Sequence, residues 1–289
     1  MDSKELLQKV RQIEIKTRGL SAQLFSGEYH SAFKGKGMTF SEVRDYSHGD
    51  DIRNIDWNVT ARFNEPFVKV FEEERELCVM LLIDVSASGI FGSNTQLKKH
   101  FIAEIAAVLA FSSSLNNDKI GVILFSDKVE KFIPPKKGKK HVLRIIRDLL
   151  EFTPENKATN ISVGLRYLAN VIKKKSTVFL ISDFIDNNFS DAIKIANKKH
   201  DVIGLRIFDP KEKELPSVGL VKLSDNESGK EMWINTSSSK TKEAHKKWWL
   251  KQEAELNSIF IKSGIDFVSL NIDHPYIRPL MGLFKKRGA

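Results

Sequence analysis

The stretch that decides the fold is CVMLLIDVSASGIFG, residues 78–92. Six apolar residues lead directly to Asp84, and hydroxyl side chains follow at alternate positions, at Ser86 and Ser88. An apolar run of this length that is bounded by small polar residues is typical of a buried strand. The sequence therefore predicts a central strand that ends in a carboxylate and continues into a short loop rich in oxygen donors.

Length, composition and charge fit an ordinary globular protein. The chain has 289 residues, of which 41% are hydrophobic and 29% charged, which gives room for one large α/β domain and a smaller one. Its net charge of +9 comes from short basic runs interspersed with acids, so we expect no nucleic-acid partner. The single cysteine excludes an internal disulfide and favours the cytoplasm. No apolar stretch approaches the ~20 residues that span a bilayer.

Strand-like and helix-like segments alternate through most of the chain. Strands are expected at residues 77–84, 118–126, 176–184, 201–209 and 265–272, and helices at residues 96–115, 139–152, 161–172, 189–200 and 239–264. This alternation predicts a three-layer, doubly wound α/β fold, in which helices cover both faces of a mainly parallel sheet. Residues 128–135 are expected to pair back on the preceding strand, and residues 274–289 to form an irregular strap.

Polar side chains from three loops are expected to meet at one edge of this sheet. Ligands of an open α/β sheet bind at the carboxyl ends of the strands. Asp183 ends a second strand and Thr159 immediately precedes a helix, so they join Asp84, Ser86 and Ser88 there. Two carboxylates and three hydroxyls, with no His or Cys, suit a hard divalent cation. We therefore expect Mg²⁺ or Mn²⁺ at these residues, bound weakly when no partner is present.

The same residues resemble a known metal site. The pattern Asp-x-Ser-x-Ser, with Thr159 and Asp183 downstream, is similar to the metal-ion-dependent adhesion site of von Willebrand factor A domains, over roughly residues 76–272. The resemblance implies that Mg²⁺ bridges the domain to an acidic residue of a protein partner. Two alternatives stay open. In the first, the serines and Asp183 only cap local structure. In the second, Thr153 takes the place of Thr159.

A second motif precedes this domain. Residues 35–76, GKGMTFSEVRDYSHGDDIRNIDWNVTARFNEPFVKVFEEERE, closely resemble the domain-of-unknown-function 58 family of bacterial proteins. Members carry this motif just before a von Willebrand A-like domain and are often encoded beside MoxR-type AAA+ ATPases, which implies such an ATPase as the partner. Many relatives begin with transmembrane helices. This chain does not, so we expect membrane contact only through partners.

The motif sets the expected division of the chain. Residues 1–75 should form a helix followed by a small β-rich segment, and residues 76–289 the von Willebrand A-like domain with its strap. Aspartates and arginines alternate in the motif, and we favour ion pairs within the fold as the reason. The alternative is a partner-binding surface at Arg53, Asp56 and Trp57, because Trp and Arg are frequent interface anchors.

The expected function is a metal-dependent protein-interaction module, an adaptor for the ATPase and not an enzyme. A Mg²⁺-dependent, phosphatase-like hydrolase is one alternative, since it uses the same kind of sheet and a strand-end aspartate. That chemistry needs a second carboxylate two residues after the nucleophile, where this chain has Ser86, and a lysine that no motif provides. A basic nucleic-acid-binding protein is the other alternative, and only the net charge supports it.

Overall fold

The computed structural model describes residues 8, 10–17, 38–73, 77–86, 95–154, 158–186, 188–224 and 231–288. The chain divides into two compact units. The smaller unit is Phe33–Glu76, and the larger one combines Met1–Ala32 with Leu77–Ala289. The expected division after residue 75 stays a prediction; in the structure the smaller unit ends at Glu76.

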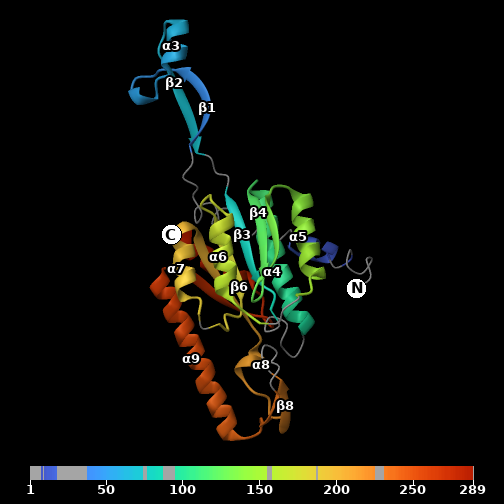
Figure 1. Ribbon diagram of the computed structural model, residues 1–289. Coiled ribbons are helices and arrows are strands. Elements are labelled where there is room, and N and C mark those ends of the chain that lie inside the picture. The colour runs from blue at the N-terminus through green and yellow to red at the C-terminus, as the bar shows by residue number, and fades with distance from the viewer. Residues whose placement is uncertain are drawn as a thin grey trace. The chain divides into compact units, whose positions relative to one another are not determined.

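A six-stranded sheet forms the centre of the larger unit (Figure 1). Its strand order is β10-β7-β6-β3-β4-β5, and all neighbours are parallel except β5, which returns antiparallel to β4. The strands are β3 (Cys78–Asp84), β4 (Lys119–Phe125), β5 (Val129–Lys136), β6 (Thr177–Ser182), β7 (Asp201–Phe208) and β10 (Asp266–Asn271). The mainly parallel sheet is as the sequence predicts, and so is the antiparallel pairing of β5 with the preceding strand β4.

Helices cover both faces of this sheet, which gives three layers (Figure 1). Strand side chains alternate between faces, and Met80 and Leu82 of β3 pack with residues of α6, α7 and α9. On the other face Phe179 of β6 packs edge-on against Phe284 of α10, with 6.2 Å between the ring centroids. The helices are α4 (Thr95–Leu115), α5 (Lys139–Glu151), α6 (Ile161–Val171), α7 (Ser190–Lys199), α8 (Pro210–Lys213), α9 (Ser239–Ser263) and α10 (Ile277–Gly288).

Two terminal segments differ from expectation. Helical residues 10–17 group with the larger unit, not with the motif segment, because Ile13 is buried and Lys16 pairs with Glu104 of α4 at 2.6 Å. The irregular strap predicted for residues 274–289 is wrong, since α10 forms there. Pro279 lies in the first helical turn, where a missing N–H costs little, and buried Leu280 and Phe284 are one turn apart.

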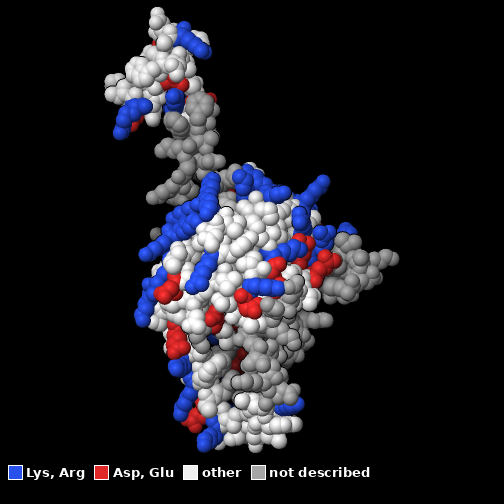
Figure 2. All heavy atoms as spheres, viewed as in Figure 1, with Lys and Arg blue, Asp and Glu red and all other residues white. Residues whose placement is uncertain are grey.

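Smaller elements complete the described chain. In the larger unit β8 (Leu220–Ser224) and β9 (Glu231–Asn235) form a two-stranded antiparallel sheet between α8 and α9. In the described parts of the chain, none of the helices combines the length and the apolar character that a bilayer crossing requires. Figure 2 shows acidic side chains lying among the basic ones on the visible face of the larger unit, in agreement with the interspersed charges of the sequence.

The smaller unit is a hairpin with two short helices. β1 (Met38–Asp45) pairs antiparallel with β2 (Phe67–Glu73), and the connection contains η1 (Ile52–Asn54) and α3 (Trp57–Phe63). Asp56 caps α3 by accepting hydrogen bonds from two backbone N–H groups, at 3.0 and 3.3 Å. The α3 helix was not expected from the glycine- and aromatic-rich motif.

Ion pairs form within the motif, but its tryptophan, Trp57, is not buried. Arg44 binds Asp50 through two hydrogen bonds of 2.9 and 2.7 Å, and this pairing lowers the pKa of the Asp50 carboxyl. Arg53 pairs with neighbouring Asp51 at 2.9 Å. The Trp57 residue is 69% exposed. Arg44 and Arg53 therefore pair with aspartates of the motif, while Trp57 is exposed.

Trp57→Ala should leave the stability of the smaller unit nearly unchanged, by less than ~0.5 kcal/mol, because exposed side chains contribute little. Val68→Ala is the matched control, since Val68 of β2 is buried and its loss should cost about 2 kcal/mol. Hydrogen exchange of the β2 amides in the full chain measures both effects. If Trp57→Ala accelerates exchange as much as Val68→Ala does, the indole ring is part of the core.

Candidate functional site

The strand order places β3 and β6 at the switch point of the sheet. The chain runs from β3 to β4 and β5 on one side, and then returns to β6 on the other side of β3. Ligand sites of doubly wound sheets lie outside the carboxyl ends of the strands at such a point. Asp84 is the last residue of β3, and Asp183 follows the last residue of β6. Both predicted carboxylates therefore belong to neighbouring strand ends.

A chain of hydrogen bonds joins the hydroxyl groups to Asp84. Thr159 Oγ1 donates to Ser86 Oγ at 2.7 Å, although these residues are 73 positions apart. The backbone N–H of Ser86 donates to Asp84 Oδ1 at 3.0 Å, and Ser182 Oγ donates to Asp84 Oδ2 at 2.7 Å. The structure thus brings together three of the five predicted ligands, and it adds Ser182. Ser88 lies outside the described residues.

The loop that carries Thr159 is fixed where it enters α6. The Asn160 N–H donates to the Ser126 carbonyl at 2.9 Å, beyond the end of β4, and the Asn160 side chain caps α6. Asp186, in the loop after β6, accepts the Ile161 N–H at 2.8 Å. Because α6 begins at Ile161, these contacts hold its first turn, and Thr159 just before it, beside the ends of β3 and β6.

The charged form of the Asp84 carboxylate is electrostatically unfavourable. Its residue is 3% exposed. Burial, and then the charge of Asp183, raise the pKa of Asp84 to about 7, and hydrogen bonds from Ser86 and Ser182 only partly oppose this rise. A buried anion beside a second anion is unfavourable unless a cation compensates them. The pair is therefore suited to attract a cation.

Asp183 contacts such a cation, which comes from the protein itself. Lys98 of α4 is 1% exposed, and its Nζ lies 3.4 Å from Asp183 Oδ2 and 3.1 Å from Glu212 Oε1 of α8. Burial by itself would lower the pKa of Lys98, but Asp183 and Glu212 outweigh it and raise that pKa. The lysine is therefore charged. Asp183 Oδ1 accepts the Ile185 N–H at 3.2 Å.

Sequence reasoning missed Lys98 and Glu212. One signal was present for the lysine, because Lys98, Ile102 and Ile105 follow helical spacing and so lie on the apolar face of α4. Glu212 had no comparable signal, since only the tertiary fold brings α8 to the site. Lys98 also removes one of the two objections to a phosphatase-like hydrolase. The other objection stands, because Ser86 occupies the position of the required second carboxylate.

The oxygen donors fit a hard divalent cation. In the described segments, no group of three or more His, Cys, Asp or Glu side chains is arranged to hold a metal ion. A cation here would rest on the two carboxylates, the hydroxyls of Ser86 and Thr159, and water. This donor set is the kind that Mg²⁺ and Mn²⁺ accept. Burial and the neighbouring Asp183 raise the pKa of Asp84, so a cation at this position would favour the charged form of its carboxyl.

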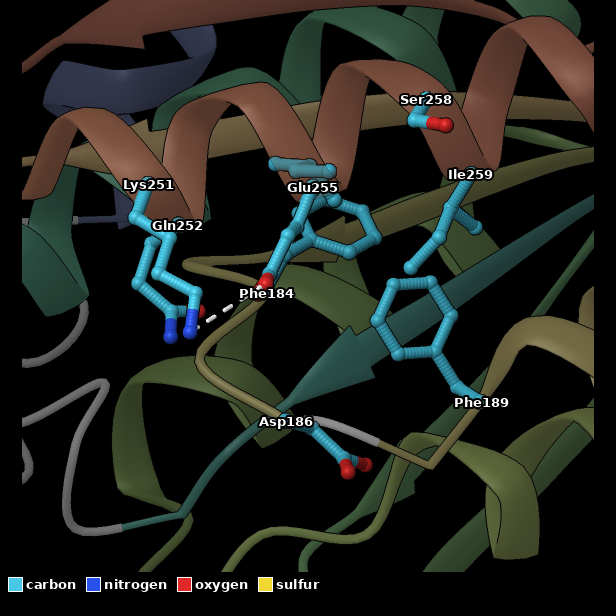
Figure 3. A pocket seen from close by; sticks show the side chains of 9 residues that line it. Phe184, Asp186, Phe189, Lys251, Gln252, Glu255, Ser258 and Ile259 are labelled. Atoms are coloured by element: carbon cyan, nitrogen blue, oxygen red, sulfur yellow. Dashed lines mark ion pairs between the residues drawn. The ribbon is translucent and has the colours of Figure 1, made fainter. Parts of the chain in front are cut away.

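A pocket of about 540 Å³ lies between α9 and the loop after β6 (Figure 3). Phe184, which follows Asp183 and adopts a left-handed backbone conformation with φ of 59°, contributes to its lining. In Figure 3 Phe189 faces Ile259 across the pocket, and the Lys251–Glu255 ion pair (3.8 Å) lies at its edge. The pocket thus has an aromatic wall and a charged rim. Its lining includes Phe184, the residue that follows the predicted ligand Asp183.

Sequence comparison places this arrangement in a family. The model of the family described as "Protein of unknown function DUF58" matches residues 42–255, from β1 of the smaller unit to α9 of the larger. The chain belongs to the DUF58 family. Uncharacterized proteins of Mycobacterium tuberculosis and Mycobacterium bovis are each 28% identical to it over 232 residues, which cover 79% of this chain and 73% of those proteins. The resemblance inferred from residues 35–76 is confirmed.

Several solved structures align with most of this chain at low sequence identity. An aerotolerance-related membrane protein from Bacteroides fragilis gives a TM-score of 0.48 at 15% identity, and covers 73% of this chain and 99% of that chain. The BatB protein from Bacteroides thetaiotaomicron gives 0.43 at 15% identity, with 73% and 98% covered. The SpRpn10 VWA domain gives 0.38 at 13% identity, with 72% and 93% covered. Independently of these alignments, the mainly parallel six-stranded sheet with helices on both faces is the three-layer α/β architecture predicted from the sequence.

Without divalent cations, Asp84→Asn should stabilise the protein at pH 8 by on the order of 2 kcal/mol, with little effect at pH 4. The pKa of Asp84 is about 7 in the folded chain and ~3.9 when unfolded, so the folded state binds the extra proton between these values. Wild-type stability therefore falls as the pH rises from about 4 to 7, and asparagine avoids this loss. Urea unfolding in chelator at both pH values measures it.

Asp191→Asn is the control, because this side chain is 96% exposed and should have little effect at either pH. Mg²⁺ added at pH 8 should raise the melting temperature of the wild type but not that of Asp84→Asn. An Asp84→Asn effect that is equal at pH 4 and pH 8 would show that Asp84 is not held in a raised-pKa environment.

Proposed function

We propose that this protein is a non-catalytic interaction module, which binds an acidic side chain of a partner protein through a divalent cation at the strand ends. The observation that carries the proposal is the convergence of Asp84, Ser86 and Thr159 in one hydrogen-bonded group beside Asp183. Groups that only capped local structure would have no reason to meet from three separate loops at the switch point of the sheet.

The residues that would hold the cation are Asp84, Ser86, Thr159 and Asp183, with Ser88 added by the resemblance to the von Willebrand A site. A bound divalent cation supplies a coordination position that a carboxylate from another molecule can occupy. The Ser182 hydroxyl donates to Asp84 Oδ2 and so orients this carboxylate, while Asp183 Oδ1 accepts the Ile185 N–H. With only two carboxylates among these ligands, the site favours a third, external one.

The partner we propose is a MoxR-type AAA+ ATPase, because genes of the DUF58 family often lie beside genes of such ATPases. The smaller unit offers a second contact surface for it. Ile52, Trp57 and Phe63 are 66–69% exposed, although all three are large and hydrophobic. Exposed aromatic side chains of this kind are frequent interface anchors, so the Trp57 surface favours interaction over a purely structural role for the motif.

Catalysis is not part of the proposal. A phosphatase-like mechanism requires a general acid two residues after the nucleophilic aspartate, and Ser86 at that position cannot fill the role at neutral pH. Lys98 neutralises carboxylates inside the protein, and its residue is only 1% exposed. We therefore expect the purified protein to hydrolyse no phosphate monoester.

Ser86→Ala should reduce binding to the MoxR-type ATPase of the same organism by at least about tenfold, because a hydroxyl ligand is lost while no charge changes. Binding is measured with purified proteins by biolayer interferometry, in Mg²⁺ and in excess chelator. The wild-type complex should form in Mg²⁺, dissociate in chelator and form again when Mg²⁺ is restored.

The matched control is Ser176→Ala, because Ser176 is an equally buried serine that immediately precedes β6, at the opposite end of this strand from Asp183. It should bind like the wild type. A complex that persists in chelator, or that Ser86→Ala forms with wild-type affinity, would mean that the contact does not depend on the cation. The surface around Trp57 would then be the principal contact.

A further inference from the structure

We infer that Lys98 is an internal counter-cation that competes with the divalent cation for Asp183, and that Glu212 weakens this competition by sharing the ammonium group. The inference rests on the metal site proposed above. It assigns a role to two residues that belong to neither the predicted ligands nor the family motif, and it concerns the affinity of the site rather than its existence.

The contacts show how the ammonium group is shared. Lys98 Nζ lies 3.1 Å from Glu212 Oε1 and 3.4 Å from Asp183 Oδ2, so it is held between them and closer to Glu212. The Lys98 and Asp183 side chains are 1% and 2% exposed, and that of Glu212 is 11% exposed. Water therefore screens these charges poorly, and their interactions are stronger than those of surface pairs.

Glu212 is held in place by its own helix. Its Oε2 atom accepts the Asp209 N–H at 3.2 Å, while Asp209 accepts the Lys211 N–H at 2.9 Å, which together form a capping box at the start of α8. Oε1 is thereby left to face Lys98. The glutamate thus draws the ammonium group toward α8 and away from the strand end.

A second buried cation lies close by but is fixed elsewhere. Arg206 of β7 stacks its guanidinium over the Trp249 ring at 4.9 Å and pairs with Glu253 of α9 at 3.7 Å. These contacts hold its charge toward α9. The charge of Arg206 acts on Asp183 from a distance, whereas Lys98 contacts this predicted metal ligand directly, so among the described cations Lys98 is placed to compete for it.

Competition follows from the charges alone. A divalent cation bound at Asp183 would be repelled by an ammonium group that contacts the same carboxylate, in a region of low dielectric. The repulsion weakens metal binding in the absence of a partner. An acidic side chain from a partner adds negative charge at the cation and offsets this repulsion. Lys98 thereby makes metal binding more dependent on the acidic partner.

The test is a Mn²⁺ titration of the full chain without partner, followed by electron paramagnetic resonance of the free ion. Lys98→Met should lower the Kd for Mn²⁺ by about tenfold, because the competing charge is removed. Lys99→Met is the matched control, since Lys99 is the next residue of α4 and its Nζ binds the Phe152 carbonyl at 2.8 Å. It removes the same charge and should change the Kd by less than about twofold.

Glu212→Gln should have the opposite effect and raise the Kd for Mn²⁺, because Lys98 then pairs more fully with Asp183. In the Lys98→Met background the same change should have a much smaller effect, since its action passes through the lysine. If Glu212→Gln weakens binding equally in both backgrounds, glutamate acts on the metal directly and the shared-ammonium account is wrong. Circular dichroism checks that each variant is folded.

Three further outcomes overturn the inference. A folded Lys98→Met protein that binds Mn²⁺ no more tightly than the wild type shows that the lysine does not compete, while the proposed metal site stands. If Lys98→Met does not fold, Lys98→Gln replaces it in both the single and the double variant, and an unchanged or higher Kd for Lys98→Gln contradicts the inference. If neither the wild type nor any folded variant binds Mn²⁺, the proposed metal site itself fails, and this inference fails with it.

Discussion

The burial of two carboxylates at neighbouring strand ends is the constraint on which the rest of the site depends. Asp84 and Asp183 lie where β3 and β6 end, with almost no exposure to solvent. A buried anion is costly, and two adjacent ones are more so, unless hydrogen bonds and cations compensate them. The structure supplies each kind of compensation, through Ser182 and the Ser86 N–H for Asp84, and through Lys98 for Asp183.

This compensation is incomplete, and the proposed function of the site depends on its being incomplete. The pKa of Asp84 remains raised although two hydrogen bonds favour its charged form. Lys98 divides its charge between Asp183 and Glu212, so it cannot fully neutralise either. In the function proposed here, such a cluster would attract a further cation and yet hold it weakly. A weakly held cation with few anionic ligands is what a site needs when an external carboxylate is to complete it.

Much of the larger unit could be predicted from sequence because its signals are local. Uninterrupted apolar runs, such as the one before Asp84, identify buried strands, and each predicted ligand follows such a run or precedes a helix. Contacts between parts of the chain that are distant in sequence could not be predicted. Glu212 reaches the site only because α8 lies near the end of β7, and α10 was obscured by the prolines of its segment. Composition alone did not predict the exposure of Trp57, an aromatic residue in a charged motif.

The most direct test of this account is crystallographic. Crystals of the protein grown with Mn²⁺ and an acidic peptide, measured at a wavelength where manganese scatters anomalously, locate the ion independently of any binding assay. The account predicts an anomalous peak beside Asp84, Ser86 and Asp183, with a peptide carboxylate as one of its ligands. The absence of a peak there, or a peak confined to another part of the molecule, would contradict the central claim that the strand ends hold the cation.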